Sequence, residues 1–205
     1  MTTLCAFCDG KPQYRDRHTG EYICLEHARL GVVAAVERAS AQALTIRPAE
    51  PGDYGRIREL SHYFWDETDV DCFDQQYDVL ACPAFLACAG DQVVGLAAYA
   101  VEDNWGAVVL VMLNVLPDFQ GRGAGRALLN AVRDTAVARG LRRVVVVTSN
   151  DDLPALALYQ RYGFQITGIV PGLVADDHGG EFPGFAGIMV RDEIRLAYLV
   201  ERAGR

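Results

Sequence analysis

The chain has 205 residues, of which 51% are hydrophobic, so it can form one full-sized domain together with a small one. No apolar run approaches the roughly 20 residues that span a bilayer, and the first residues lack the charged start and apolar core of a signal peptide, so we expect a cytoplasmic protein with no membrane partner. The formal charge of −8 argues against a nucleic-acid partner, which needs a basic face, and suits a cationic substrate.

Two close pairs of metal-ligating side chains lie in the first thirty residues: Cys5 with Cys8 and Cys24 with His27. Each short loop brings its two ligands to one side, so the pairs can converge on one tetrahedral ion, and thiolate with imidazole favours Zn²⁺. Four protein ligands leave no open position, so the zinc should be structural and should supply the folding energy of this short segment. The alternatives are a redox Cys-x-x-Cys motif or free thiols. The pattern resembles a treble-clef or ribbon-type zinc finger, with a hairpin over residues 14–23.

The larger part of the chain begins after a helix-like run that follows His27. Leu44–Arg47 alternates as a strand, and a polar break then precedes a helix that carries Ile57 and Leu60. The expected domains are a zinc finger at 1–30, a helical linker at 31–43 and the main domain at 44–205.

Five carboxylates lie among the nine residues from Asp66 to Asp74. Such a segment could attract an amine or a guanidine, or it could be a solvated acidic loop. Two strands, Phe85–Ala89 and Val93–Val101, flank a Gly-Asp-Gln turn and predict a hairpin, with the next strand at Trp105–Val115. The sheet is therefore expected to be antiparallel in this region.

The second half of the chain alternates between helical and strand patterns. Apolar residues at helical spacing predict a helix over Gly123–Arg139, and the continuous apolar run Val144–Thr148 is typical of a central strand. The remaining expected elements are a helix at Pro154–Tyr162, a strand at Phe164–Val170, a glycine-rich mobile loop at Pro171–Pro183, a strand at Phe185–Val190 and a terminal helix at Ile194–Arg202.

The segment Gln120–Gly125 has three glycines in five residues and opens a helix. Glycines let the backbone approach a bulky anion, and the helix start directs unpaired N–H groups and the positive dipole end toward it. The segment therefore predicts a pyrophosphate-binding loop. A dinucleotide fingerprint would need a glycine where this chain has Arg126, and the Gly-Lys-Ser/Thr of a nucleotide-triphosphate loop is absent from this segment.

The pattern Gln/Arg-x-x-Gly-x-Gly/Ala, which here follows a strand ending at Leu113–Pro117, resembles the acyl-CoA loop of the GNAT N-acetyltransferases. A second feature of that family lies downstream, in Asn150 and the segment Ala155–Phe164. The resemblance implies an α/β fold of mixed α+β type, with a largely antiparallel central sheet and flanking helices. It also implies that the loop amides hold the CoA pyrophosphate and that the preceding strand offers backbone groups to the pantetheine arm.

The resemblance assigns roles to individual residues. Tyr159 stands where many family members have the phenol that protonates the leaving thiolate, although the same residue could simply pack in the core. Asn150 would bind the pantetheine arm or order the strand end, or else cap the next helix. The implied cofactor-binding residues are Leu113, Val115, Gln120, Gly121, Arg122, Gly123, Ala124, Gly125, Arg126, Asn150 and Tyr162.

The general base is not identified by the sequence. Family members often carry a carboxylate or histidine on the strand before the loop, where this chain has Val109, Val111 and Leu113. A water chain could serve instead, because an amine of modest pKa needs only a weak proton acceptor. The side-chain candidates are Glu67, Glu102, Asp103 and His178.

Two functions are compatible with these patterns. The first is an acetyl-CoA-dependent N-acetyltransferase acting on a primary amine of a small molecule or protein, with the zinc finger used for docking or for pairing two chains. The alternative is a non-catalytic acyl-CoA sensor with the finger as its effector. The tyrosine at position 159 favours catalysis, whereas the missing strand carboxylate favours the sensor.

Overall fold

The computed structural model describes residues 14–15, 22–23 and 43–200. Within these residues, no helix is both long enough and apolar enough to cross a membrane. The dominant element is a seven-stranded sheet in the order β10-β13-β9-β8-β7-β6-β3, in which only β8 and β9 run parallel. Its strands are β3 (Leu44–Pro48), β6 (Ala84–Ala89), β7 (Gln92–Glu102), β8 (Ala107–Val115), β9 (Arg143–Ser149), β10 (Gln165–Val170) and β13 (Glu193–Leu199).

Helices cover both faces of this sheet. On one face lies α2 (Tyr54–Trp65), whose buried residues join the apolar cluster that contains Val109. On the other lie α3 (Ala124–Ala138) and α4 (Leu153–Tyr162), which pack on the cluster that contains Val108. Adjacent residues of one strand point to opposite faces, so β8 is buried on both sides. The continuous apolar runs of the sequence are the consequence of this double coverage.

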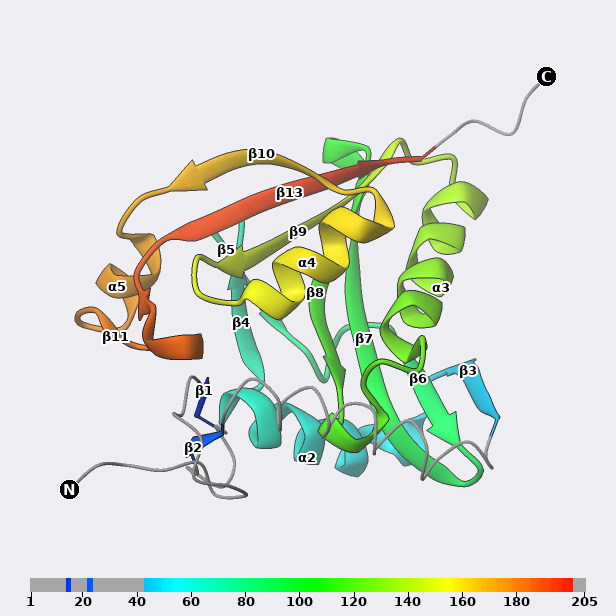
Figure 1. The fold of residues 1–205 in the computed structure, drawn as a ribbon. Helices are drawn as coiled ribbons and strands as arrows, with labels where there is room; N and C mark the ends of the chain where they lie inside the picture. The colour runs from blue at the N-terminus through cyan, green and yellow to red at the C-terminus, as the bar shows by residue number, and fades with distance from the viewer. Residues whose placement is uncertain (1–13, 16–21, 24–42, 201–205) are drawn as a thin grey trace.

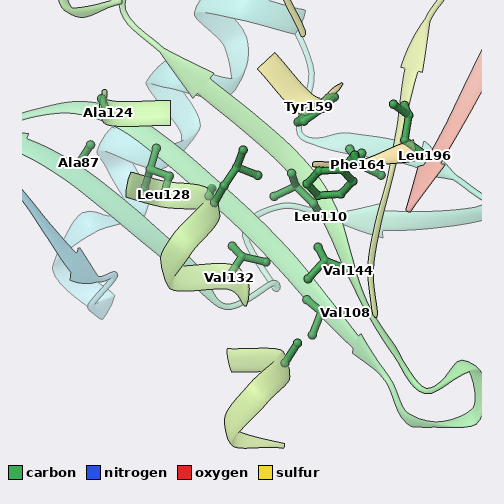
Figure 2. Packing of buried hydrophobic residues seen from close by; sticks show 14 of the residues in the cluster. Ala87, Val108, Leu110, Ala124, Leu128, Val132, Val144, Tyr159, Phe164 and Leu196 are labelled. Carbon is green, nitrogen blue, oxygen red and sulfur yellow. The ribbon is translucent and has the colours of Figure 1, made fainter. Parts of the chain in front are cut away.

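The face of the sheet that α3 covers holds a cluster of buried apolar side chains. Figure 2 shows Val132 of α3 near Val108 and Val144 of the sheet, and Leu128 of α3 toward Ala87 and Ala124. Leu128 and Val132 are four residues apart and therefore lie on one side of their helix. This packing fixes the start of α3 relative to the strands.

The central strands β8 and β9 stay paired over a short length only. Their parallel register runs from Ala107 opposite Arg143 to Leu110 opposite Val146, and no pairing continues beyond it along the two strands. On its other edge β8 carries an irregularity, because Leu110 pairs with Tyr99 but Met112 pairs with the preceding residue of β7. The extra residue bends β8 at the point where its pairing with β9 ends. The sheet therefore forks at its middle.

The N-terminal hairpin expected over residues 14–23 is confirmed. The short strands β1 (Tyr14–Arg15) and β2 (Tyr22–Ile23) pair antiparallel, and β1 lies beside the 3₁₀ helix η4 (Phe185–Gly187) (Figure 1). The helical linker expected at 31–43, except its last residue, lies outside the described residues. The proposed zinc ligands also lie outside them; these ligands are Cys5, Cys8, Cys24 and His27. Among the described residues, no cluster of histidine, cysteine or carboxylate side chains could hold a metal ion.

The C-terminal segment contradicts the helix predicted at Ile194–Arg202. It forms β13, which lies between β9 and β10 in the sheet. Residues Glu193, Ile194, Leu196 and Ala197 are all buried, and strand pairing on both edges outweighs the helix propensity of Arg, Leu and Ala.

Other boundaries also differ from the prediction. The strand predicted from Trp105 starts two residues later, because Asp103–Trp105 forms the 3₁₀ helix η2, which ends at Gly106 with φ +60°. The predicted loop over 171–183 contains α5 (Leu173–Asp177) and β11 (Phe182–Pro183), and the strand predicted over 185–190 is η4 followed by β12 (Met189–Val190). The acidic segment 66–74 lies mostly in a hairpin of β4 (Asp69–Cys72) and β5 (Gln75–Asp78).

Candidate active site

A cavity of about 690 Å³ lies where β8 and β9 part. Its walls come from both sides of the sheet: the last turn of α2 on one side, and α3 with α4 on the other. A cavity can reach both faces of a sheet only where neighbouring strands are unpaired. The cavity therefore depends on the separation of β8 and β9 beyond their last residue pair. The lining residues are Tyr63, Phe64, Trp65, Leu113, Asn114, Val115, Phe119, Gln120, Gly121, Gly123, Ala124, Gly125, Arg126, Asp152, Pro154, Ala155, Ala157, Leu158, Tyr159, Arg161, Tyr162 and Phe185.

The glycine loop forms the end of the cavity on the α3 side. Gly121 and Gly123 have φ values of +74° and +88°, which residues with a Cβ rarely adopt. Gly123 is the N-cap of α3 and offers no side-chain partner to the amides of the first turn, and the first intrahelical bond runs from Ala127 N to Gly123 O (2.9 Å). A helix start without a side-chain cap in a cavity wall can bind an anion. The loop therefore fits a pyrophosphate.

Side chains around the loop fix its position. Gln120 Nε2 donates to the carbonyl of Val115 (2.9 Å), so that carbonyl is engaged by the protein itself. Arg126 lies in the cavity wall, with its guanidinium 5.6 Å from the centre of the Tyr162 ring. Arg122, by contrast, does not line the cavity: its guanidinium lies 4.7 Å from the Phe119 ring. Of the two predicted arginines, only Arg126 faces the cavity.

Tyr159 belongs both to the core and to the cavity wall. The residue is 5% exposed, its ring lies 5.5 Å from that of Phe164, and it also lines the cavity. Burial raises the pKa of the Tyr159 phenol, and the charge of Asp152 raises it further. The phenol therefore keeps its proton at neutral pH, which is the state that a general acid requires.

Asn150 follows the end of β9, and its side chain binds the segment that leads into β13. Its amide nitrogen donates to the carbonyl of Met189 (2.9 Å), and its amide oxygen accepts from the backbone nitrogens of Arg191 and Asp192, both at 2.9 Å. It does not line the cavity. Its observed role is to order the connection from β12 to β13.

Sequence reasoning missed Asp152, which lines the cavity and caps α4 by accepting from Ala155 N (3.1 Å). The sequence does indicate this helix cap, because an aspartate two residues before Pro154 is a typical N-cap. The neighbouring Asp151 is 1% exposed and accepts from Ser149 Oγ and from Phe185 N (2.7 Å). A Cβ at Gly184 would collide with the Asp151 carboxylate, so glycine allows η4 to lie against this turn.

The candidates for a general base lie elsewhere. Glu67, Glu102, Asp103 and His178 are not in the cavity wall. Glu102 accepts a hydrogen bond from the Tyr77 hydroxyl (3.1 Å), and His178 Nδ1 lies 2.9 Å from the carbonyl of Val174. The acidic segment 66–74 is also outside the wall, and its Asp74 pairs with Arg195 (3.2 Å). Asp152 is the carboxylate among the described residues that line the cavity.

Known proteins are similar to this chain in sequence and in architecture. Residues 51–164, more than half of the chain, match the family model described as Acetyltransferase (GNAT) family. Aminoglycoside N(6')-acetyltransferase type 1 from Stenotrophomonas maltophilia is 32% identical over 138 residues, which cover 62% of this chain and 90% of that protein. L-methionine sulfoximine/L-methionine sulfone acetyltransferase from Pseudomonas aeruginosa is 31% identical over 116 residues, which cover 52% of this chain and 67% of that protein.

The fold agrees with these matches. The structure is similar to that of a GNAT family acetyltransferase from Elizabethkingia anophelis with acetyl-CoA bound, with a TM-score of 0.60 and 24% identity over 76% of this chain and 97% of that chain. The predicted mixed sheet with flanking helices is therefore confirmed as a GNAT-like fold. Since the relatives are named as enzymes, they do not favour the non-catalytic sensor. The chain belongs to the acetyltransferase (GNAT) family, and it is an N-acetyltransferase.

Proposed function

We propose that the protein transfers the acetyl group of acetyl-CoA to a primary amine, with the donor on the α3 side of the sheet and the amine on the α2 side. The observation that carries this proposal is the cavity at the fork, which joins the glycine loop to the end of α2. The loop would hold the pyrophosphate through the first-turn amides of α3, and Arg126 would add a positive charge there. When bound, acetyl-CoA supplies the thioester from which the acetyl group is transferred.

Donor residues beyond the loop follow from their place in the wall. Leu113 and Val115 lie on the part of β8 that β9 no longer pairs with. Backbone groups on this edge, apart from the Val115 carbonyl that Gln120 binds, can therefore bind an extended ligand. Tyr162 lines the same side, where its hydroxyl donates to Asn130 Oδ1 (2.9 Å). Asn150 and Arg122 are not included, because their side chains bind other parts of the protein.

Two side chains are proposed to move protons. Tyr159 holds a proton on its phenol oxygen and would give it to the departing sulfur. Asp152 would accept the proton of the attacking amine, directly or through a water molecule. The proton lost by the amine is thereby balanced against the proton gained by the thiol.

The test is thiol release from acetyl-CoA in the presence of a pooled panel of primary amines, with each product identified by its mass increase. We expect thiol release that depends on the amine, together with acetyl-CoA binding when no amine is present. Binding without release for any amine would contradict transfer to small amines, and a protein acceptor would then be sought by the same assay with peptides.

We further propose that residues 1–30 form a zinc finger outside the chemistry, joined by a helical linker at 31–43 to the catalytic domain at 44–205. The antiparallel pairing of β1 and β2 supports a hairpin between the two ligand pairs. The place of β1 beside η4 supports a role for the finger in docking an acceptor or a second chain, because Phe185 of η4 lines the cavity.

A further inference from the structure

The α2 side of the cavity is lined by aromatic rings. Tyr63, Phe64 and Trp65 come from the last turn of α2, and Phe185 comes from η4. The Tyr63 and Phe64 rings meet edge to face with their centres 4.9 Å apart. Trp65 remains 47% exposed, which is high for the largest aromatic side chain, although it lies in a cavity wall. Flat apolar groups pack well on such a surface.

One polar side chain is buried among these rings. Asn114 is 6% exposed and also lines the cavity. Trp65 Nε1 donates to Asn114 Oδ1 (3.1 Å), and because an indole N–H can only donate, this contact fixes which end of the amide faces the tryptophan. The Nδ2 group then points away from Trp65 and has no hydrogen-bond partner among the described residues.

A buried N–H group without a partner costs about 1–3 kcal/mol, so native proteins seldom keep one without a role. The protein itself supplies no partner for this group among the described residues. Asn114 lines the cavity while its Nδ2 group is covered in this structure, so a molecule bound in the cavity would become its partner once the covering atoms shift.

The charged lining residues lie on the opposite side of the fork. Arg126 and Arg161 belong to α3 and α4, and Asp152 precedes α4. The described lining residues from α2, β8 and η4 are uncharged. A polycationic amino sugar or a free amino acid carboxylate would meet no opposite charge on that part of the wall.

We propose that the α2 side of the cavity recognises a primary amine with a flat, apolar body that packs on Trp65 and with an oxygen or nitrogen atom that accepts a hydrogen bond from Asn114 Nδ2. This inference rests on the proposed transfer to an amine and adds the class of acceptor. Trp65 acts twice, since its ring contacts the acceptor and its N–H orients the amide.

The acceptor class is tested by thiol release from acetyl-CoA, measured separately for each amine. The aryl amines are benzylamine and its ortho-, meta- and para-methoxy derivatives, and the non-planar analogue is cyclohexylmethylamine. Kanamycin represents the polycationic amino sugars and glycine the free amino acids. We expect kcat/KM for benzylamine to exceed that for the non-planar cyclohexyl analogue about five- to tenfold. The best methoxy isomer should exceed benzylamine about fivefold, the gain expected from one hydrogen bond. Turnover of kanamycin or glycine in preference to the aryl amines would overturn the inference and leave the transferase proposal intact. No thiol release with any of these amines would overturn the acceptor class, and no release with the amine panel or with peptides would overturn both proposals.

Variants of Trp65 separate the ring from its N–H group. Trp65→Leu should abolish the preference for benzylamine over the cyclohexyl analogue. Trp65→Phe should retain that preference but lose the preference for the methoxy isomer, because Asn114 is no longer oriented. The matched control is Tyr54→Leu, since Tyr54 is on the same helix, 50% exposed and outside the cavity wall. An unchanged aryl preference in Trp65→Leu would overturn the assignment of this side.

The Asn114→Leu variant tests the role of the amide through thermal stability as well as through turnover. It replaces the amide with an apolar group of similar size, so the buried N–H without a partner disappears, and the indole N–H of half-exposed Trp65 can bond to water. We expect a Tm equal to or above that of the wild type, unchanged acetyl-CoA affinity and no preference for the methoxy isomer. A lower Tm with a retained methoxy preference would show that the amide is structural.

Discussion

The Asp152 carboxylate accepts a hydrogen bond from the backbone nitrogen of Ala155 (3.1 Å) while it lines the cavity, so one side chain both caps α4 and faces the reaction. Asp152→Asn separates the two roles, because asparagine caps a helix as well as aspartate but is a poor proton acceptor. We expect about 10²–10⁴-fold lower turnover at neutral pH with an unchanged Tm. Asp152→Ala should lose about 1 kcal/mol of stability as well. Normal turnover in Asp152→Asn would show that Asp152 does not accept the proton of the attacking amine and that a water chain alone does so.

Tyr159→Phe removes a hydroxyl group from a ring that stays packed against Phe164. Turnover should fall about 10²–10⁴-fold, the usual range for the loss of a general acid, while acetyl-CoA affinity changes little. Steady-state kinetics and calorimetry measure the two quantities. Full turnover with an intact fold would reduce Tyr159 to a packing residue.

Gly123→Glu places a side chain and a negative charge at the proposed pyrophosphate site, and we expect CoA binding to be lost. The same change at Gly140 is the matched control. Gly140 follows the other end of α3 with φ +67°, so it imposes similar backbone strain far from the loop. Calorimetry should show CoA binding in Gly140→Glu but not in Gly123→Glu. Equal affinities would contradict the loop assignment.

Asp53 stabilises the approach to α2 through its two hydrogen bonds from Arg47, at 2.7 and 2.8 Å. These bonds lower the pKa of Asp53 from 3.8 to about 2. Because the folded-state pKa is the lower one, the stabilisation is complete above pH 3.8 and is lost as the pH falls toward 2. Asp53→Asn should therefore cost about 1 kcal/mol at pH 7, and the difference from the wild type should vanish near pH 2. Chemical denaturation at both pH values measures it, and a cost that does not depend on pH would contradict the ion pair.

Elemental analysis of protein purified without chelators should find one zinc ion per chain if Cys5, Cys8, Cys24 and His27 form the proposed site. Cys24→Ser should lose the metal and retain acetyl-CoA affinity, whereas Cys82→Ser, in the catalytic domain, should keep both. A higher acceptor KM or dissociation of a dimer in Cys24→Ser would show what the finger binds. Absence of zinc would refute the site, and loss of acetyl-CoA affinity on zinc removal would refute its separation from the chemistry.

Elements with a strong local pattern were predicted well from the sequence, and those that depend on distant pairing were not. The helix at Ala124–Ala138 and the hairpin of β6 and β7 match their predictions because their periodicity and turn residues are local. The local pattern predicts a helix over Ile194–Arg202, but Glu193–Leu199 forms a strand because it pairs with β9 and β10, which lie earlier in the chain. Its burial on both faces removes the alternation that marks a strand.

The site was predicted only in part for a similar reason. The glycine loop has a sequence signature, whereas the aromatic end of α2 meets Asn114 only because the chain folds. Trp65 and Asn114 are 49 residues apart, and no spacing rule connects them. Asn150 was assigned by resemblance, but its hydrogen bonds run to a segment about 40 residues later, whose path the sequence did not reveal.

The short pairing of β8 with β9 has a mechanical consequence. In the part of the chain that the structure describes, four residue pairs, from Ala107–Arg143 to Leu110–Val146, form the one backbone ladder between a four-stranded half of the sheet (β3, β6, β7 and β8) and a three-stranded half (β9, β13 and β10). Any motion that separates the halves must pivot at the last of these pairs. A small rotation there changes the width of the cavity directly, so the stiffness of this pivot, and of the α3 packing that spans it, sets how far the two sides of the site can open.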